Sequence, residues 1–183
     1  MPELSEQEYQ QFQELLDREA IREVIFTYCR GIDRIDEDSL RRVYWPDAID
    51  EHSVFDGPAD EFIPWVIETL RGMKATQHNI CNLSISVEGS DAWCESYFIA
   101  HHKLEGEAED GGGERDMIAA GRYLDHMQKR GGEWRIKHRR VVYDWDLEQP
   151  STTNWAAPAQ SDVMRRGARA PSDEVFTMRK ALS

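Results

Sequence analysis

The chain has 183 residues, the length of one ordinary domain or of one domain with a tail. Hydrophobic residues make up 40% and charged residues 31%, a balance typical of a soluble globular protein. The 22 Lys and Arg against 35 Asp and Glu give a net charge of −13. This charge excludes a nucleic-acid partner or an anionic membrane surface, because both require a basic binding face.

No segment of the sequence indicates export or membrane insertion. The longest uncharged apolar stretch is far shorter than the ~20 residues of a membrane helix. The N-terminal segment MPELSEQEYQQF has neither the basic nor the apolar region of a secretory signal. Cys29, Cys81 and Cys94 are odd in number and form no CxxC pair, which favours free thiols in a reducing compartment. We therefore expect a cytoplasmic protein without a membrane partner.

The first part of the chain predicts three helices and a short strand. Apolar residues recur at helical spacing over residues 5–31, and Gly31 is a plausible helix end. Asp36 can cap a short second helix. A strand is expected over residues 48–54, and Pro58 suits the first position of a third helix.

From residue 75 the apolar period changes to two, which predicts long strands. Four are expected, over residues 76–87, 93–104, 114–128 and 133–146. Their short connections favour an antiparallel meander. The sequence therefore predicts an α+β fold, in which three helices cover a curved antiparallel or mixed sheet and close a cone-shaped pocket. We assign residues 1–146 to this domain and residues 147–183 to a tail.

The familiar cofactor motifs are missing. Gly111 to Gly113 are not followed by the Lys-Ser of a phosphate loop, and no GxSxG elbow occurs. None of the six histidines belongs to an HExxH motif, so we expect no metal and no cofactor. Asp33 and His78 stand in apolar surroundings, yet Asp33 could simply bond its own backbone and His78 could be an ordinary core residue. Spacing alone does not pair them.

A family resemblance does pair them. The segment REAIREVIFTYCRGIDRIDEDSLRRVYWPDA resembles the start of SnoaL-like proteins of the nuclear transport factor 2-like superfamily. The later segments ATQHNI and GGEWRIKHRRVVYDW fit the same pattern, and the resemblance covers roughly residues 10–146. It implies the same α+β cone that the periodicity predicts.

Within this branch the chain is most similar to the bile-acid 7α-dehydratase family, and it is related to scytalone dehydratase. The resemblance implies that His78 is a general base held by Asp33, that Tyr28 donates a hydrogen bond, and that Arg139 polarises a carbonyl. Arg140 is a neighbour of Arg139, and a bulge would exchange their faces.

Hexachlorocyclohexane dehydrochlorinase shares the Asp–His pair. That family has a Lys where Tyr28 stands and a Trp near Asp50, and this chain has neither. Dehydrochlorination is therefore disfavoured.

The resemblance implies a cofactor-independent dehydratase acting on a hydrophobic hydroxy-carbonyl compound, steroid-like, bile-acid-like or otherwise polycyclic. The alternatives are a ketosteroid-type isomerase or polyketide cyclase, and, from another class, a non-catalytic ligand-binding module or a dioxygenase β-type structural subunit. Plausible pocket walls, each of which could instead be plain core, are Trp45, Phe55, Phe62, Trp65, Tyr97 and Tyr123.

We also expect a homo-oligomer, with a trimer favoured over a dimer, because the open sheet needs cover. Tyr143 and Trp145 suit such an interface. The tail is expected to pack over its own or a neighbouring subunit through Trp155 and Phe176, with a disordered tail as the alternative.

Overall fold

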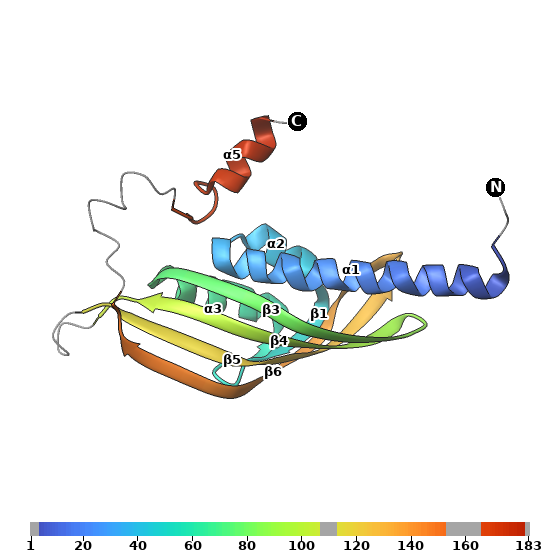
Figure 1. Ribbon diagram of the computed structural model, residues 1–183, viewed down its shortest axis with the longest axis horizontal. Helices are drawn as coiled ribbons and strands as arrows, with labels where there is room; N and C mark the ends of the chain where they lie inside the picture. Colours follow the sequence, from blue (N-terminus) through green and yellow to red (C-terminus); the bar gives the residue numbers. More distant parts are fainter. Residues whose placement is uncertain (1–3, 107–112, 153–165, 182–183) are drawn as a thin grey trace.

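The computed structural model describes residues 4–106, 113–152 and 166–181. The helices are α1 (Glu6–Arg34), α2 (Glu37–Val43), α3 (Ala59–Arg71) and α5 (Glu174–Ala181). The strands are β1 (Tyr44–Glu51), β2 (Asp56–Pro58), β3 (Met73–Glu88), β4 (Asp91–Leu104), β5 (Arg115–Arg130) and β6 (Glu133–Pro150). Figure 1 shows the three N-terminal helices set against one curved sheet.

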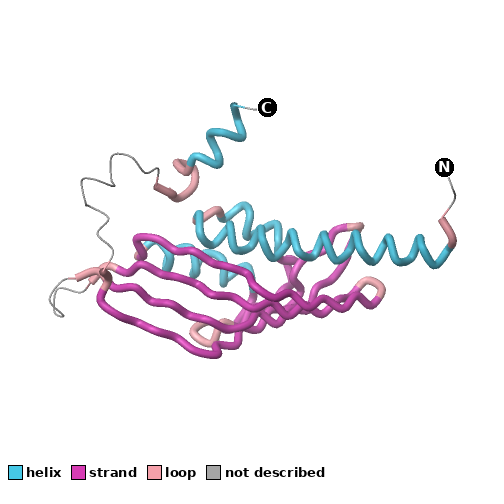
Figure 2. The backbone as a smooth tube through the Cα atoms, viewed as in Figure 1, coloured by secondary structure: helices cyan, strands magenta, loops and turns pink. Residues whose placement is uncertain are grey.

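The six strands form one mixed sheet in the order β2-β1-β6-β5-β4-β3. Strands β3 to β6 form the expected antiparallel meander, β1 joins β6 in parallel, and β2 pairs antiparallel with β1. Helix α1 contacts both the edge strand β3 and the more central β6, as the curl of the sheet allows (Figure 2). The expected α+β cone is confirmed.

Helix α1 is longer than the sequence suggested. It begins with a capping box, in which the Ser5 hydroxyl accepts from the Glu8 amide at 3.3 Å. It continues through Gly31 to Arg34 and ends at Ile35, which has a φ of 52°. Gly31 was expected to end the helix, but it serves packing: a Cβ there would lie 2.7 Å from Leu40 Cδ2 on α2. Asp33 therefore belongs to the last turn of α1.

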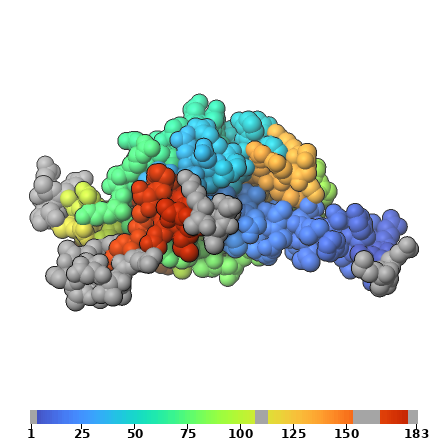
Figure 3. All heavy atoms as spheres, turned by 90° about the horizontal axis from the view of Figure 1, so that it is seen from above, coloured from blue at the N-terminus to red at the C-terminus, as the bar shows by residue number. Residues whose placement is uncertain are grey.

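The C-terminal segment lies beside the end of α1 (Figure 3). Strand β6 runs to Pro150, beyond the expected end at residue 146. The amide of Ala170 donates to the Arg34 carbonyl at 2.6 Å, and the Arg30 guanidinium lies 5.2 Å from the Phe176 ring centre. Phe176 is thus a contact of the tail within one chain, whereas Trp155 lies outside the described residues.

The predicted homo-oligomer concerns contacts between chains and stays a prediction. Of the two aromatic residues assigned to its interface, Trp145 is 51% exposed. Tyr143 is 47% exposed, lines a cavity on the concave side of the sheet and meets Phe98 edge to face. In the described part of the chain, no helix has the length and apolar character needed to cross a membrane.

A bulge in β6 lies between Tyr143 and Trp145, so these two residues do not share a face as alternate strand residues otherwise would. Gly121 pairs with Tyr143 while Ala120 pairs with Trp145, so Asp144 is the extra residue. A Cβ on Gly121 would lie 2.1 Å from the Val142 carbonyl oxygen, so only glycine allows the two backbones this close.

We expect Gly121→Ala to lower the free energy of unfolding by about 3 kcal/mol, because the backbone must move to relieve the clash. Gly113→Ala is the matched control, since a Cβ there meets nothing within 4 Å and its cost should stay within about 0.5 kcal/mol. Urea unfolding followed by circular dichroism measures both. Equal stability of the two variants would contradict this account of the bulge.

Candidate active site

An interior cavity of about 360 Å³ lies between the helices and the concave face of the sheet. Its walls are mostly apolar and come from α1, α3 and all the long strands. They comprise Tyr28, Ile32, His52, Val54, Trp65, Val66, Thr69, Leu70, Met73, His78, Phe98, Ala100, His102, Met117, Ala119, Tyr123, Val141, Tyr143 and Asp146. A mostly apolar cavity with a few polar groups is the usual form of a small-molecule site.

Asp33 and His78 form a closely held pair at this cavity. The Nδ1 atom of His78 lies 2.8 Å from Asp33 Oδ1, and the backbone amide of His78 donates to Asp33 Oδ2 at 2.9 Å. Both side chains are about nine-tenths buried. The Asp33 carboxylate therefore holds both the imidazole ring of His78 and the backbone of β3 at this residue. The Nε2 atom of His78 is the ring nitrogen left available to exchange a proton.

Tyr28 and Asp33 serve different sides of helix α1. Five residues along a helix turn the side-chain direction by roughly 140°. Tyr28 lines the cavity, whereas Asp33 reaches His78 from the adjoining groove on the outside of the helix. Helix α1 continues without a break through Gly31, so Tyr28 and Asp33 line different spaces, and His78 lines both.

Arg139 does not line the cavity. Its guanidinium is fully buried and donates to Asp125 through Nε at 2.7 Å and Nη2 at 2.8 Å. It lies 4.0 Å from the ring centre of Tyr28 and 4.2 Å from that of Tyr123. Arg139 thus stands behind the two phenols and supports them, which corrects the expectation that it meets a carbonyl.

The choice between the two neighbouring arginines is also resolved. The side chain of Arg140 is 61% exposed and pairs with Glu51 on the outside of the sheet. Arg139 lies opposite Asp50 in the strand register between β6 and β1, and its side chain is buried on the inner face.

The expected aromatic walls separate into three groups. Trp65 and Tyr123 line the cavity. Phe62 and Phe55 pack behind it, with Phe62 fully buried and its ring 5.6 Å from that of Phe55. The remaining two lie outside the cavity.

Trp45 and Tyr97 are directed away from the cavity. Trp45 donates to the Gln128 carbonyl at 2.9 Å and is covered by the guanidinium of Arg135. Tyr97 is 42% exposed and lies under Arg122 on the outer face. Each of these two rings was expected to line the cavity and is instead covered by an arginine side chain.

Two histidines at the cavity were missed by the sequence reasoning. The His102 ring meets that of His78 edge to face at 5.4 Å, and burial, together with the nearby His78, lowers the pKa of His102 to about 4. His52 bonds to Asp50 and lies 3.3 Å from the Tyr28 hydroxyl. The spacing Asp50-Glu51-His52 at the end of a strand was the available signal, because alternate strand residues share a face.

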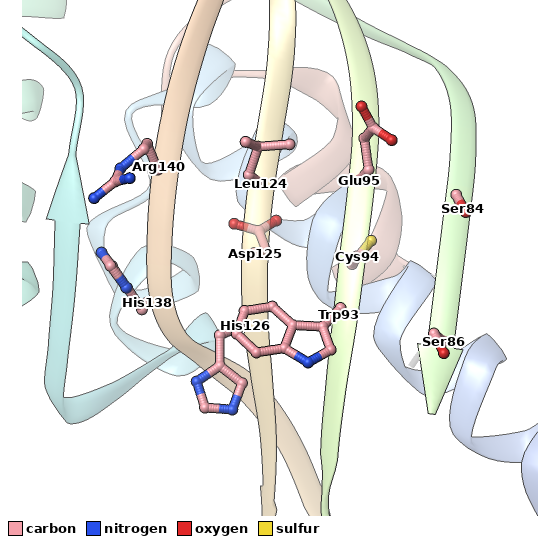
Figure 4. Close-up of a pocket in the computed structure, with 10 residues that line it drawn as sticks. All are labelled: Ser84, Ser86, Trp93, Cys94, Glu95, Leu124, Asp125, His126, His138 and Arg140. Atoms are coloured by element: carbon pink, nitrogen blue, oxygen red, sulfur yellow. The ribbon is translucent and has the colours of Figure 1, made fainter. Parts of the chain in front are cut away.

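A second hollow lies on the exposed side of strands β3 to β6 (Figure 4). There the Trp93 and His126 rings stack at 4.7 Å, and His126 Nε2 lies 2.7 Å from Asp91. None of the four expected catalytic side chains reaches it. Across residues 4–106, 113–152 and 166–181, no group of three or more His, Cys, Asp or Glu could hold a metal ion. The interior cavity is therefore the candidate active site.

We expect Asp125→Ala to lower the free energy of unfolding by about 3–5 kcal/mol, because it leaves the buried Arg139 charge without its partner. Arg140→Ala is the matched control on the same strand, since its exposed ion pair should contribute less than about 1 kcal/mol. Chemical unfolding of both variants measures the difference. Similar losses would contradict the central role given to the buried pair.

The lowered pKa of His102 predicts how stability depends on pH. Between about pH 6.5 and 4, His102 is protonated in the unfolded chain but neutral in the folded chain. The free energy of unfolding therefore falls as the pH falls through this range. Replacing His102 by Gln should remove up to roughly 3 kcal/mol of this acid-induced loss. Unfolding free energies at about pH 7 and about pH 4.5 test it. Parallel curves for both proteins would exclude the effect.

Residues 13–140 match the SnoaL-like domain family. No curated protein sequence matches the chain.

Several solved structures share the fold. The hexachlorocyclohexane dehydrochlorinase LinA, type 2, aligns with a TM-score of 0.69 at 18% identity, over 82% of this chain and 99% of that one. A scytalone dehydratase-like protein from Novosphingobium aromaticivorans gives 0.63 at 21% identity, over 87% and 95%. The Kfla4162 protein from Kribbella flavida gives 0.66 at 18% identity, over 73% and 95%.

At these sequence identities the similarity to solved structures shows the fold alone. The family match covers most of the chain and includes Tyr28, Asp33, His78 and Arg139. This chain therefore belongs to the SnoaL-like domain family.

Proposed function

We propose that the protein is a cofactor-independent hydro-lyase, which eliminates water from a hydrophobic compound carrying a hydroxyl group near a carbonyl. The observation that carries the proposal is the buried Asp33–His78 pair, 2.8 Å apart, with the imidazole on the wall of an apolar cavity. Structural relatives described as a dehydrochlorinase and as scytalone dehydratase-like add support from the same fold.

His78 is the general base in this proposal. With Nδ1 held by Asp33, the imidazole can take a proton from the carbon next to the carbonyl through Nε2. The carboxylate fixes the tautomer and stabilises the imidazolium that forms.

Tyr28 is the hydrogen-bond donor. Burial raises the pKa of its phenol well above the ordinary value, so the group stays protonated at neutral pH. A protonated phenol in the cavity wall can donate to a leaving hydroxyl or to a carbonyl oxygen. The Arg139 cation against the back of the ring opposes the effect of burial, which favours the phenol as a donor.

The cavity limits the substrate. A volume of about 360 Å³ lies toward the small end of ligand pockets, and Trp65, Phe98 and Tyr143 offer flat apolar walls. These features support a compact ring system, of which a steroid-like or other polycyclic hydroxy-ketone is the class we propose.

An isomerase or cyclase is the nearest alternative, because the same base could move a proton without expelling a group. The buried Asp–His pair facing an open apolar cavity favours an enzyme over a structural subunit, whose cavity would be filled by core side chains.

A substrate screen tests the proposal. Ring-hydroxylated ketosteroids, bicyclic hydroxy-ketones and hydroxyacyl thioesters are incubated with the protein, and a conjugated product is detected by its ultraviolet absorbance. The product mass separates elimination, which loses one water, from isomerisation, which loses nothing. Turnover without loss of water would replace the lyase by the isomerase.

A double-mutant cycle then tests the pair. His78→Ala and Asp33→Asn should each lower kcat by about 10²–10⁴-fold, since both remove one proton transfer. The double variant should be little worse than either single one. His101→Ala, next to His102 but paired with Asp116 outside the cavity, is the control and should keep kcat. Full activity in His78→Ala, or strictly additive losses, would show that the pair is not the catalytic unit.

A further inference from the structure

The same cavity carries a second Asp–His pair. Asp50 has no exposed surface, and it is held by the Tyr44 hydroxyl, which donates at 2.6 Å, and by Nδ1 of His52. The His52 ring stacks on Phe62, with ring centres 4.6 Å apart and planes 20° apart. The His52 side chain is 13% exposed, and this surface faces the cavity.

His52 is connected to Tyr28 through its other nitrogen. Nε2 of His52 lies 3.3 Å from the Tyr28 hydroxyl, which also lines the cavity. Tyr44, Asp50, His52 and Tyr28 thus form one continuous line of polar contacts. It runs from the fully buried Asp50 carboxylate to the cavity wall, beside the ring of Phe62.

The two histidines are held differently. The hydrogen bond of the His78 ring is made through Nδ1, which leaves Nε2 for the substrate. Both nitrogens of His52 are engaged, one by Asp50 and one by Tyr28. A ring with both nitrogens engaged cannot accept a proton from carbon, but it can pass one to Tyr28.

The strands bring these groups to the cavity from opposite edges of the sheet. His52 follows β1, near one end of the strand order, and His78 lies on β3 at the other end. A substrate between them would meet a base from one edge and a donor from the other, so proton removal and protonation of the leaving group could take place at separate points.

We propose that Asp50, His52 and Tyr28 form a proton relay that delivers a proton to the departing oxygen, and this inference rests on the proposed dehydration. His78 removes the proton from carbon, the electrons of the C–H bond form the C=C bond, and the C–O bond breaks. The departing oxygen takes the Tyr28 proton and leaves as water, while Tyr28 takes the proton of the His52 imidazolium. Proton exchange with solvent then discharges His78 and recharges His52.

In this scheme Tyr28 is catalytic, because it touches the departing oxygen. His52 and Asp50 act through it and are positioning residues: His52 supplies the proton, and Asp50 stabilises the charged ring. Arg139, 4.0 Å from the centre of the Tyr28 ring, stabilises the negative charge that develops as the phenol gives up its proton.

A change of leaving group tests the relay. The probes are 3-hydroxy-1-decalone and 3-fluoro-1-decalone, which give the same ultraviolet-absorbing enone. Hydroxide is a strong base and needs a proton to leave, whereas fluoride leaves without one. The two probes are nearly equal in size, so binding alone should not separate them.

The key variants are Tyr28→Phe and His52→Gln. Tyr28→Phe removes one oxygen and keeps the ring against Arg139, and His52→Gln keeps polar contacts with Asp50 and Tyr28 but carries no exchangeable charge. Each should lower kcat for the hydroxy probe by about 10²–10⁴-fold and change kcat for the fluoro probe by less than about tenfold. Asp50→Asn should likewise lower kcat for the hydroxy probe much more than kcat for the fluoro probe. A merely structural role of Asp50 would lower both equally.

His78→Ala separates this inference from the proposed function, because it should lower kcat for both probes. If the relay variants lose activity equally on both probes, or lose none, the relay is wrong while the base at His78 stands. If His78→Ala retains activity on both, or the wild-type protein eliminates neither group, the proposed elimination is wrong and the relay falls with it. Thermal melting of each variant confirms that the fold is kept.

Discussion

The interior of this protein is organised around one buried cation. The Arg139 guanidinium has no exposed surface, and a charge so placed is tolerated only with a partner at hydrogen-bond distance. Asp125 on the neighbouring strand provides it with two short contacts. The rings of Tyr28 and Tyr123 lie against the guanidinium, with their centres 4.0 Å and 4.2 Å from its central carbon.

This arrangement joins helix α1 to the middle of the sheet. Tyr28 is fixed from behind by the cation and meets Tyr123 at a ring distance of 5.6 Å. Its hydroxyl group is therefore held at the cavity while its ring belongs to the core. A phenol positioned by a buried ion pair loses little rotamer freedom when it meets a substrate, which is what a hydrogen-bond donor in a site needs.

The architecture could be predicted from the sequence because each element has a clear local signal. The helical spacing of α1, the Asp36 cap of α2 and the alternation of the four long strands all appear in the structure. The prediction that the helix ends at Gly31 was wrong, because a glycine can mark either a helix end or a close contact. Only the tertiary structure shows Leu40 against this glycine. Trp45 misled in a similar way, since its apolar ring is covered by Arg135 and not by a ligand.

The candidate site was less predictable from the residues alone. Asp33 and His78 are 45 residues apart, and only the family resemblance paired them. Arg139 was drawn from the same resemblance, but the number of residues between two positions does not say which carboxylate a buried guanidinium will meet. His52 and His102 were missed because a single histidine in a sequence usually has no special role. Their position at the cavity depends on how strongly the sheet curls.

The end of helix α1 links the candidate base to the C-terminal segment. A helix of 29 residues carries partial negative charge at its last turn, and the Asp33 carboxylate adds to it there. Two cationic side chains stabilise this negative charge by donating to the backbone carbonyl of Asp33. Arg34 donates to this carbonyl at 3.3 Å, and Arg169 donates to it from a position 136 residues further along the chain. The docked C-terminal segment thus places a cation next to the Asp33–His78 pair and also contacts Met73 of the cavity wall, so a part of the chain outside the cone takes part in building the candidate site.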